Sequence, residues 1–141
     1  PQEITDDKIY NLRQLNYTYW LNNRSSEEWV GTVVGKWKTF MTNTVNHWRA
    51  KHDNVLDNGG WHFTNMGGYH QILKKLESYD HAFECNIPYV TNDLEKRMEK
   101  GEDYLGREFD WRGKPFTSWL DESELPEYIL KNKDNLKHLW K

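Results

Sequence analysis

Apolar residues recur at helical spacing directly after the glycine pair Gly67-Gly68, and charged residues occupy the opposite face. This pattern predicts the clearest helix of the chain, beginning at or just after the two glycines. The apolar stripe consists of Tyr69, Ile72, Leu73, Leu76 and Tyr79.

Two further helices are predicted towards the C-terminus. Asn92 and Glu95 form a capping box for a helix from about 93 to 100, and Gly101 supplies its stop. Pro126 suits the first turn of a final helix.

The first third of the chain contains weaker helical patterns. Thr5 can cap a short helix, and a longer stripe follows Gly35. The apolar positions of the short helix are Ile9, Leu12 and Leu15. Those of the longer stripe are Trp37, Phe40, Met41, Thr44 and Trp48.

Residues typical of strands fill the segments 17–21 and 29–34, and 61–63 can form a third, short strand. The intervening segment 51–60 is predicted to be a loop. Two or three strands make a small sheet. We therefore expect part of an α/β or α+β domain whose remaining strands lie elsewhere.

The composition is polar but rich in aromatic residues. Hydrophobic residues make up 36% of the 141 residues, mean hydropathy is −1.03, and there are 8 Trp and 8 Tyr. Disordered chains are poor in aromatics, so this chain is expected to fold. Flat aromatic faces also suit the apolar faces of pyranose sugars, although core packing is the commoner role of any single Trp.

The charge pattern argues against a dedicated nucleic-acid surface, because the net charge is −3 and no basic run is present. The single cysteine, Cys85, fits a reducing compartment. No apolar run is long enough to span a membrane, and no signal peptide is visible. Because the sequence begins at Pro1 rather than Met, we expect a segment upstream of it.

The segment 59–68 has the most informative chemistry, because the glycine pairs Gly59-Gly60 and Gly67-Gly68 bracket Trp61 and His62. Glycine lets the backbone approach a ligand closely, and a helix start offers N–H groups to an anion. An imidazole can bind a metal or donate to a phosphate. The segment indicates a polyanion site, for instance for a nucleotide diphosphate; a structural His62 bonded to backbone is the alternative.

Other candidate groups are less specific. Asp57 and Glu84 can each act as a general base on a sugar hydroxyl, although a solvated surface acid is the commoner role. His81 follows the predicted helix, about 15 Å from its start, so it need not meet His62. Glu108 and Asp110 can bind a divalent cation.

The run Gly60-Trp61-His62-Phe63-Thr64-Asn65-Met66-Gly67-Gly68, followed by Ile72, Lys75-Leu76 and His81, resembles glycosyltransferase family 17. That family includes the β-1,4-mannosyl-glycoprotein β-1,4-N-acetylglucosaminyltransferases. The resemblance extends over most of the chain from about Tyr17 onward. Three further segments resemble parts of that family: Trp29-x-Gly31-Thr32, the run from Gly101 through Asp103 to Arg107, and Leu125-Pro126-x-Tyr128-Ile129 with Asn132 and Lys137-His138.

The resemblance implies a GT-A-type nucleotide-sugar transferase, which is expected to be inverting. Such an enzyme transfers a sugar, here expected to be N-acetylglucosamine, from a UDP-linked donor to a glycan or glycoprotein acceptor. Mn²⁺ or Mg²⁺ is held by an Asp-x-Asp in the N-terminal nucleotide-binding half. Residues 1–141 are then expected to be the acceptor-side half, a single partial domain that is inactive without the other half.

The same resemblance implies roles for individual residues. The donor diphosphate or sugar would be bound by Gly60, Trp61, Gly67 and Gly68. The metal would be contacted by His62 and His81, and the catalytic base would be Asp57 or Glu84. Viral or bacterial relatives would act in the cytoplasm, and animal ones in the Golgi lumen.

Two other functions compete with glycosyl transfer. A non-catalytic carbohydrate-binding module would use the Trp and Tyr surfaces without nucleotide or metal. A histidine–metal nuclease is a weaker hypothesis, because the chain is acidic and lacks a basic patch.

Overall fold

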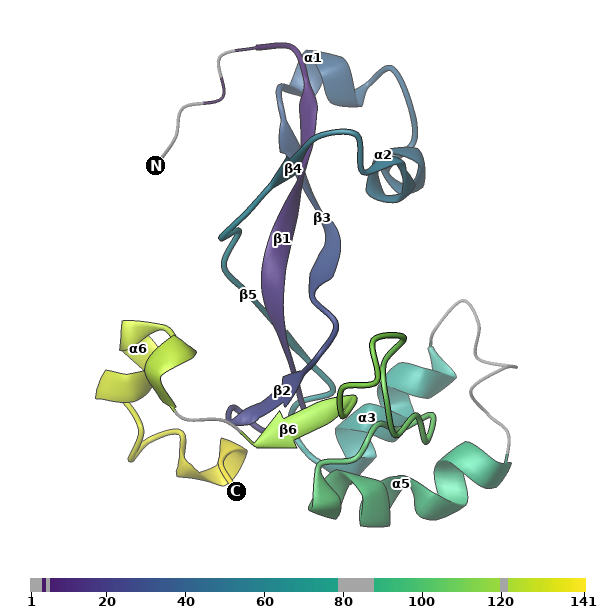
Figure 1. Ribbon diagram of the computed structural model, residues 1–141, viewed down its shortest axis with the longest axis vertical. Coiled ribbons are helices and arrows are strands. Elements are labelled where there is room, and N and C mark those ends of the chain that lie inside the picture. Colours follow the sequence, from purple (N-terminus) through teal and green to yellow (C-terminus); the bar gives the residue numbers. More distant parts are fainter. Residues whose placement is uncertain (1–3, 5, 79–87, 120–121) are drawn as a thin grey trace. The chain divides into compact units, whose positions relative to one another are not determined.

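The computed structural model describes residue 4 and residues 6–78, 88–119 and 122–141 (Figure 1). Within these residues the fold is mixed α/β, with helices and a mainly antiparallel six-stranded sheet. The expected α/β or α+β class is confirmed at this level. The part of the chain that is described contains more strands than the two or three expected.

The chain divides into two compact units. Unit 1 contains Pro1–Leu15 and Glu28–His62, and unit 2 contains Asn16–Glu27 and Phe63–Lys141. The segment 59–68 passes from unit 1 to unit 2 after His62, so each part of it is described within its own unit.

In unit 1, the strand β1 (Ile9–Thr18) contributes its first residues, which pair antiparallel with β3 (Trp29–Gly35) and parallel with the short β4 (Val55–Leu56). The prediction of a short helix after Thr5 is therefore wrong. The apolar residues of this segment have helical spacing, but its backbone hydrogen bonds are made with β3 and β4 instead. The predicted strand 29–34 is confirmed by β3.

The long helix expected from Trp37 to Trp48 is two short helices, α1 (Trp37–Phe40) and α2 (Val45–Lys51). The predicted helix is interrupted at Thr44, whose backbone is extended. The Thr44 hydroxyl caps α2 by accepting a hydrogen bond from the His47 N–H at 3.2 Å. As a result the predicted apolar stripe does not form one buried face, and Trp37 is 76% exposed.

In unit 2, the core lies between α3 (Tyr69–Glu77) and α5 (Pro88–Lys100). Its buried members are Tyr19, Ile72, Leu76, Leu94 and Met98. The helix predicted after Gly67-Gly68 is confirmed, with Gly68 at its N-cap. The prediction that a capping box at Asn92 begins the next helix is wrong, because α5 already begins at Pro88.

Short elements complete the described chain. The strand β5 (Trp61–Thr64) confirms the predicted third strand and pairs with β1. In unit 2, β2 (Asn23–Ser25) pairs antiparallel with β6 (Thr117–Trp119). The C-terminal part holds the 3₁₀ turns η1 (Glu122–Glu124) and η2 (Lys137–Leu139), and α6 (Glu127–Lys131), the helix predicted after Pro126.

None of the helices within the described ranges has the length and apolar character that crossing a bilayer requires.

Candidate functional site

The first glycine pair of the segment 59–68 lies against β1. A Cβ added at Gly59 would come within 2.7 Å of the Leu12 Cβ, so only glycine fits there. The Gly59 N–H donates to the Arg13 carbonyl at 2.8 Å, and the Gly60 carbonyl accepts the Leu15 N–H at 2.9 Å. These contacts fix the backbone that leads directly into Trp61 and His62.

His62 stacks on Trp29. The ring centroids are 4.4 Å apart and the planes differ by 11°. Trp29 folds back over Gly31, where an added Cβ would lie 2.4 Å from the indole ring. The Arg49 guanidinium lies 5.5 Å from the Trp29 ring centroid. The segment Trp29-x-Gly31 and the segment Trp61-His62 therefore form one structural feature of unit 1.

Trp61 precedes the stacked histidine and is 41% exposed. Its backbone carbonyl accepts a hydrogen bond from the Gln14 side-chain amide at 3.4 Å. The neighbouring Thr32 hydroxyl donates to the Gln14 Oε1 at 2.6 Å. The backbone at Trp61 is thus attached to both β1 and β3, while its indole keeps contact with solvent.

In unit 2, Lys75 braces the middle of the segment. Its Nζ donates to the Thr64 Oγ1 at 2.7 Å and to the Asn65 Oδ1 at 2.8 Å. The Asn65 amide in turn donates to the Thr18 hydroxyl at 3.4 Å. Burial lowers the pKa of the Lys75 ammonium below its ordinary value. One helical side chain therefore holds the turn between β5 and α3.

The second glycine pair forms the start of α3. Gly67 and Gly68 have φ of 91° and 84°, a region that other L-residues rarely adopt. No side chain caps α3, so its first N–H groups are left for other partners. His70, in the first turn, is exposed.

Asp57, one of the two candidate bases, forms an ion pair with Arg13, whose Nη1 lies 2.9 Å from its Oδ1. The Arg13 Nε also lies 3.5 Å from the Glu28 carboxylate. Both acids are on the surface of unit 1. Asp57 thus lies beside the guanidinium group of a residue on a different element, β1.

The other candidate base, Glu84, and the candidate metal ligand His81 lie outside the described residues. Among the residues that are described, no three or more His, Cys, Asp or Glu side chains gather as a metal site would require.

One of the two acids in the loop after Gly106, Asp110, has a structural role. The buried Asp110 carboxylate accepts the Arg112 and Lys114 N–H groups at 2.8 and 2.9 Å, and pairs with the Arg112 guanidinium at 2.7 Å. Burial alone would raise its pKa, but these hydrogen bonds outweigh burial and lower the pKa to about 2. The Asp110 carboxylate is thus already occupied within its own loop, whereas Glu108 is exposed.

A second acid–arginine pair closes the preceding turn. The Asp103 carboxylate accepts the Arg107 Nε and Nη2 hydrogen bonds, both at 2.9 Å. It also accepts the N–H groups of Leu105 and Arg107. Asp103 and Arg107 therefore stabilise one turn together.

Comparisons with known proteins returned no match: no protein-family model, no curated protein and no solved structure is significantly similar to the chain. The functional argument therefore depends on the residues and their geometry.

Proposed function

We propose that this chain is the acceptor-side half of a GT-A-type glycosyltransferase. The full enzyme would transfer N-acetylglucosamine from a UDP-linked donor to a glycan or glycoprotein acceptor. The observation that carries the proposal is the stacking of His62 on Trp29 across Gly31. This contact joins two of the segments by which the sequence resembles glycosyltransferase family 17.

The stack supports a ligand-binding role for His62. Stacking occupies one face of the imidazole and fixes its plane, whereas the ring nitrogens bond in that plane. An imidazole held in this way is pre-organised to donate a hydrogen bond to a phosphate or to contact a metal. Trp61, partly exposed and adjacent in the chain, would pack on the sugar.

The start of α3 supports the binding of a phosphate in unit 2. An uncapped helix N-terminus carries partial positive charge, and the Gly67-Gly68 backbone has no side chain to block approach. Lys75 holds the turn before it and adds a positive charge. These features suit an anionic donor such as a nucleotide diphosphate.

The described residues do not by themselves form a Mn²⁺ or Mg²⁺ site, because no group of three ligating side chains occurs among them. A divalent ion, where the full enzyme binds one, would neutralise charge on the leaving diphosphate. The base that deprotonates the acceptor hydroxyl would be Asp57 or Glu84. For Asp57, this role requires the carboxylate to leave its ion pair with Arg13.

The proposal is tested by incubating the full-length protein with a panel of UDP-sugars, a divalent ion and oligosaccharide acceptors. We expect release of UDP together with an acceptor that gains the mass of one N-acetylhexosamine residue. Absence of transfer from every donor in the panel would contradict the proposal.

A carbohydrate-binding module is the second candidate, and exposed aromatic side chains favour it. Trp111 is 85% exposed and Tyr128 is 72% exposed. Calorimetry with an oligosaccharide separates the two functions, because the affinity of a binding module for the glycan does not change when nucleotide and metal are added. A transferase that binds its donor first would bind acceptor tightly only when nucleotide and metal are present.

A further inference from the structure

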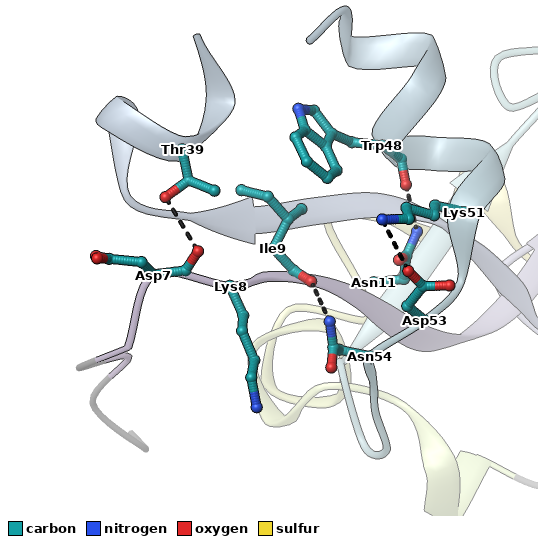
Figure 2. Close-up of a pocket in the computed structure, with 9 residues that line it drawn as sticks. All are labelled: Asp7, Lys8, Ile9, Asn11, Thr39, Trp48, Lys51, Asp53 and Asn54. Carbon is teal, nitrogen blue, oxygen red and sulfur yellow. Dashed lines mark hydrogen bonds and ion pairs between the residues drawn. The ribbon is translucent and has the colours of Figure 1, made fainter. Parts of the chain in front are cut away.

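A pocket of about 210 Å³ opens in unit 1, away in sequence from the segment 59–68 (Figure 2). Its side chains come from the start of β1, from α1, from α2 and from the turn after α2. Pockets for drug-sized ligands measure about 300–1,000 Å³. The volume therefore suits a ligand of a single ring.

The charged side chains of the pocket are paired. The Lys51 Nζ lies 3.0 Å from the Asp53 carboxylate, and the Asp7 carboxylate lies 3.1 Å from the Lys36 Nζ. The Lys8 Nζ, also in the lining, lies 3.7 Å from the Asp6 carboxylate. The cations are therefore balanced by acids and do not form an anion site. The acids are likewise balanced and do not form a cation site. A neutral, strongly polar ligand fits this lining best.

Two asparagines supply oriented amide groups. Asn11 is 2% exposed, and its Nδ2 donates to the carbonyls of Val30, Trp48 and Arg49 at 3.2–3.3 Å. The Asn54 Nδ2 donates to the Ile9 carbonyl at 3.2 Å. These bonds use the amide NH₂ groups, and no described residue donates to the Oδ1 of either side chain. Each amide oxygen can therefore accept a hydrogen bond from a ligand.

Trp48 supplies a flat apolar wall. Its indole Nε1–H donates to the Phe40 carbonyl at 3.3 Å, which fixes the orientation of the ring. The Lys51 Nζ lies 5.6 Å from the ring centroid. Ile9, Thr39, Asp53 and Asn54 also line the pocket (Figure 2). The electron-rich face of an indole attracts the polarised C–H groups on the face of a pyranose ring.

We propose that this pocket binds one pyranose ring. The ring would pack its C–H face on Trp48, and its hydroxyl groups would donate to Asp53 and to the asparagine oxygens. A pyranose has hydroxyl groups around its whole rim, which matches polar groups that come from several sides of the pocket. This site goes beyond the proposed transferase function, because it requires neither nucleotide nor metal.

The test is a titration of the full chain with the methyl pyranosides of glucose, mannose and N-acetylglucosamine, followed by the indole and side-chain amide NMR signals. We expect at least one pyranoside to shift the Trp48, Asn11 and Asn54 signals saturably. Inorganic phosphate and uridine serve as the competing ligand classes. If no pyranoside shifts these signals, or if uridine binds more tightly than every pyranoside, the proposal is overturned.

Variants confirm the location. Trp48→Ala should weaken pyranoside binding by about tenfold or more. Asp53→Asn, at a surface position that tolerates the change, should weaken it by about threefold to tenfold. Trp37→Ala is the matched control, because Trp37 belongs to the same unit, is exposed and does not line the pocket. Unchanged binding in both Trp48→Ala and Asp53→Asn would overturn the proposal.

Because no nucleotide-sugar is present in this titration, its outcome is independent of the transfer assay. Pyranoside binding without any transfer activity would leave the pocket established and would contradict only the proposed transferase function.

Discussion

The two units are stabilised in different ways. Unit 2 has a buried apolar cluster between α3 and α5, centred on the fully buried Leu94. In unit 1, α1 and α2 bury no residue completely, and its buried positions among the described residues are Ile9 and Asn11. Unit 1 is instead held together by side-chain hydrogen bonds, such as those of the Asn11 amide, and by ring stacking, such as that of His62 on Trp29.

This difference extends to the segment 59–68. Its first part is fixed in unit 1 by a stacked ring and by glycine backbone that lies against β1. Its last part is fixed in unit 2 by Lys75 and by α3, which is anchored in the core. Mutations in the two parts should therefore act through different physical effects.

The largest effect is expected in the core of unit 2. Leu94→Ala should lower the free energy of unfolding by about 2–5 kcal/mol, because it removes a fully buried side chain and leaves a cavity. Val33→Ala, at a half-buried position of unit 1, is the matched truncation and should cost less. Chemical denaturation measures both. Equal losses would show that the contrast between the units is wrong.

A second substitution targets the ring stack. Gly31→Ala places a Cβ in the space of the Trp29 indole and should cost about 1–3 kcal/mol, while it moves the indole off His62. The readout is the ring-current shift of the His62 imidazole protons. Gly113→Ala, where a Cβ has open space, should leave these protons unchanged although its positive φ adds strain. Unaltered His62 signals in Gly31→Ala would contradict the stacking.

A third substitution loosens the turn in unit 2. Lys75→Met removes the hydrogen bonds to Thr64 and Asn65 and should cost about 0.5–1.5 kcal/mol. Amide hydrogen exchange at Thr64 and Asn65 should become faster. Lys74→Met, one position away on the exposed face of α3, should leave this exchange unchanged. The bracing role is refuted if both variants exchange alike.

The smallest effect is a local pH dependence of the loop at Asp110. The pKa of this carboxyl in the folded loop is about 2, below its ordinary 3.8. The ionised form therefore stabilises the loop above the ordinary pKa, and this stabilisation is lost as the pH falls towards 2. Trp111 fluorescence should change over that interval. Asp110→Asn should abolish the transition, and its persistence in this variant would assign the change to another group.

Local patterns in the sequence were enough to predict α3, α6 and β3. Each has a regular apolar spacing or a clear boundary residue, such as Gly68 and Pro126 at the helix starts. The short strands β2, β4 and β6 could not be predicted, because two or three residues are too few to show a period. The start of β1 was mistaken for a helix, because its partners lie far away in the sequence.

The candidate site shows the same limit. The glycines, Trp61 and His62 stood out from their neighbours in the sequence. The partners that fix them, Trp29 for His62 and Lys75 for Thr64, come from other elements and emerge only from the fold. Asp57 was identified as an acid, but its pairing with Arg13 depends on the register between β1 and the turn before β5.

The most direct test of the central claim is the transfer activity of His62→Ala in the full-length protein. We expect kcat/KM for sugar transfer to fall by about a hundredfold or more while the fold is retained. The variant loses the imidazole that would donate a hydrogen bond to the diphosphate or contact the metal. His138→Ala, an exposed histidine on η2, is the control and should retain wild-type activity. Wild-type transfer by His62→Ala would contradict the role that the account gives to the stacked histidine.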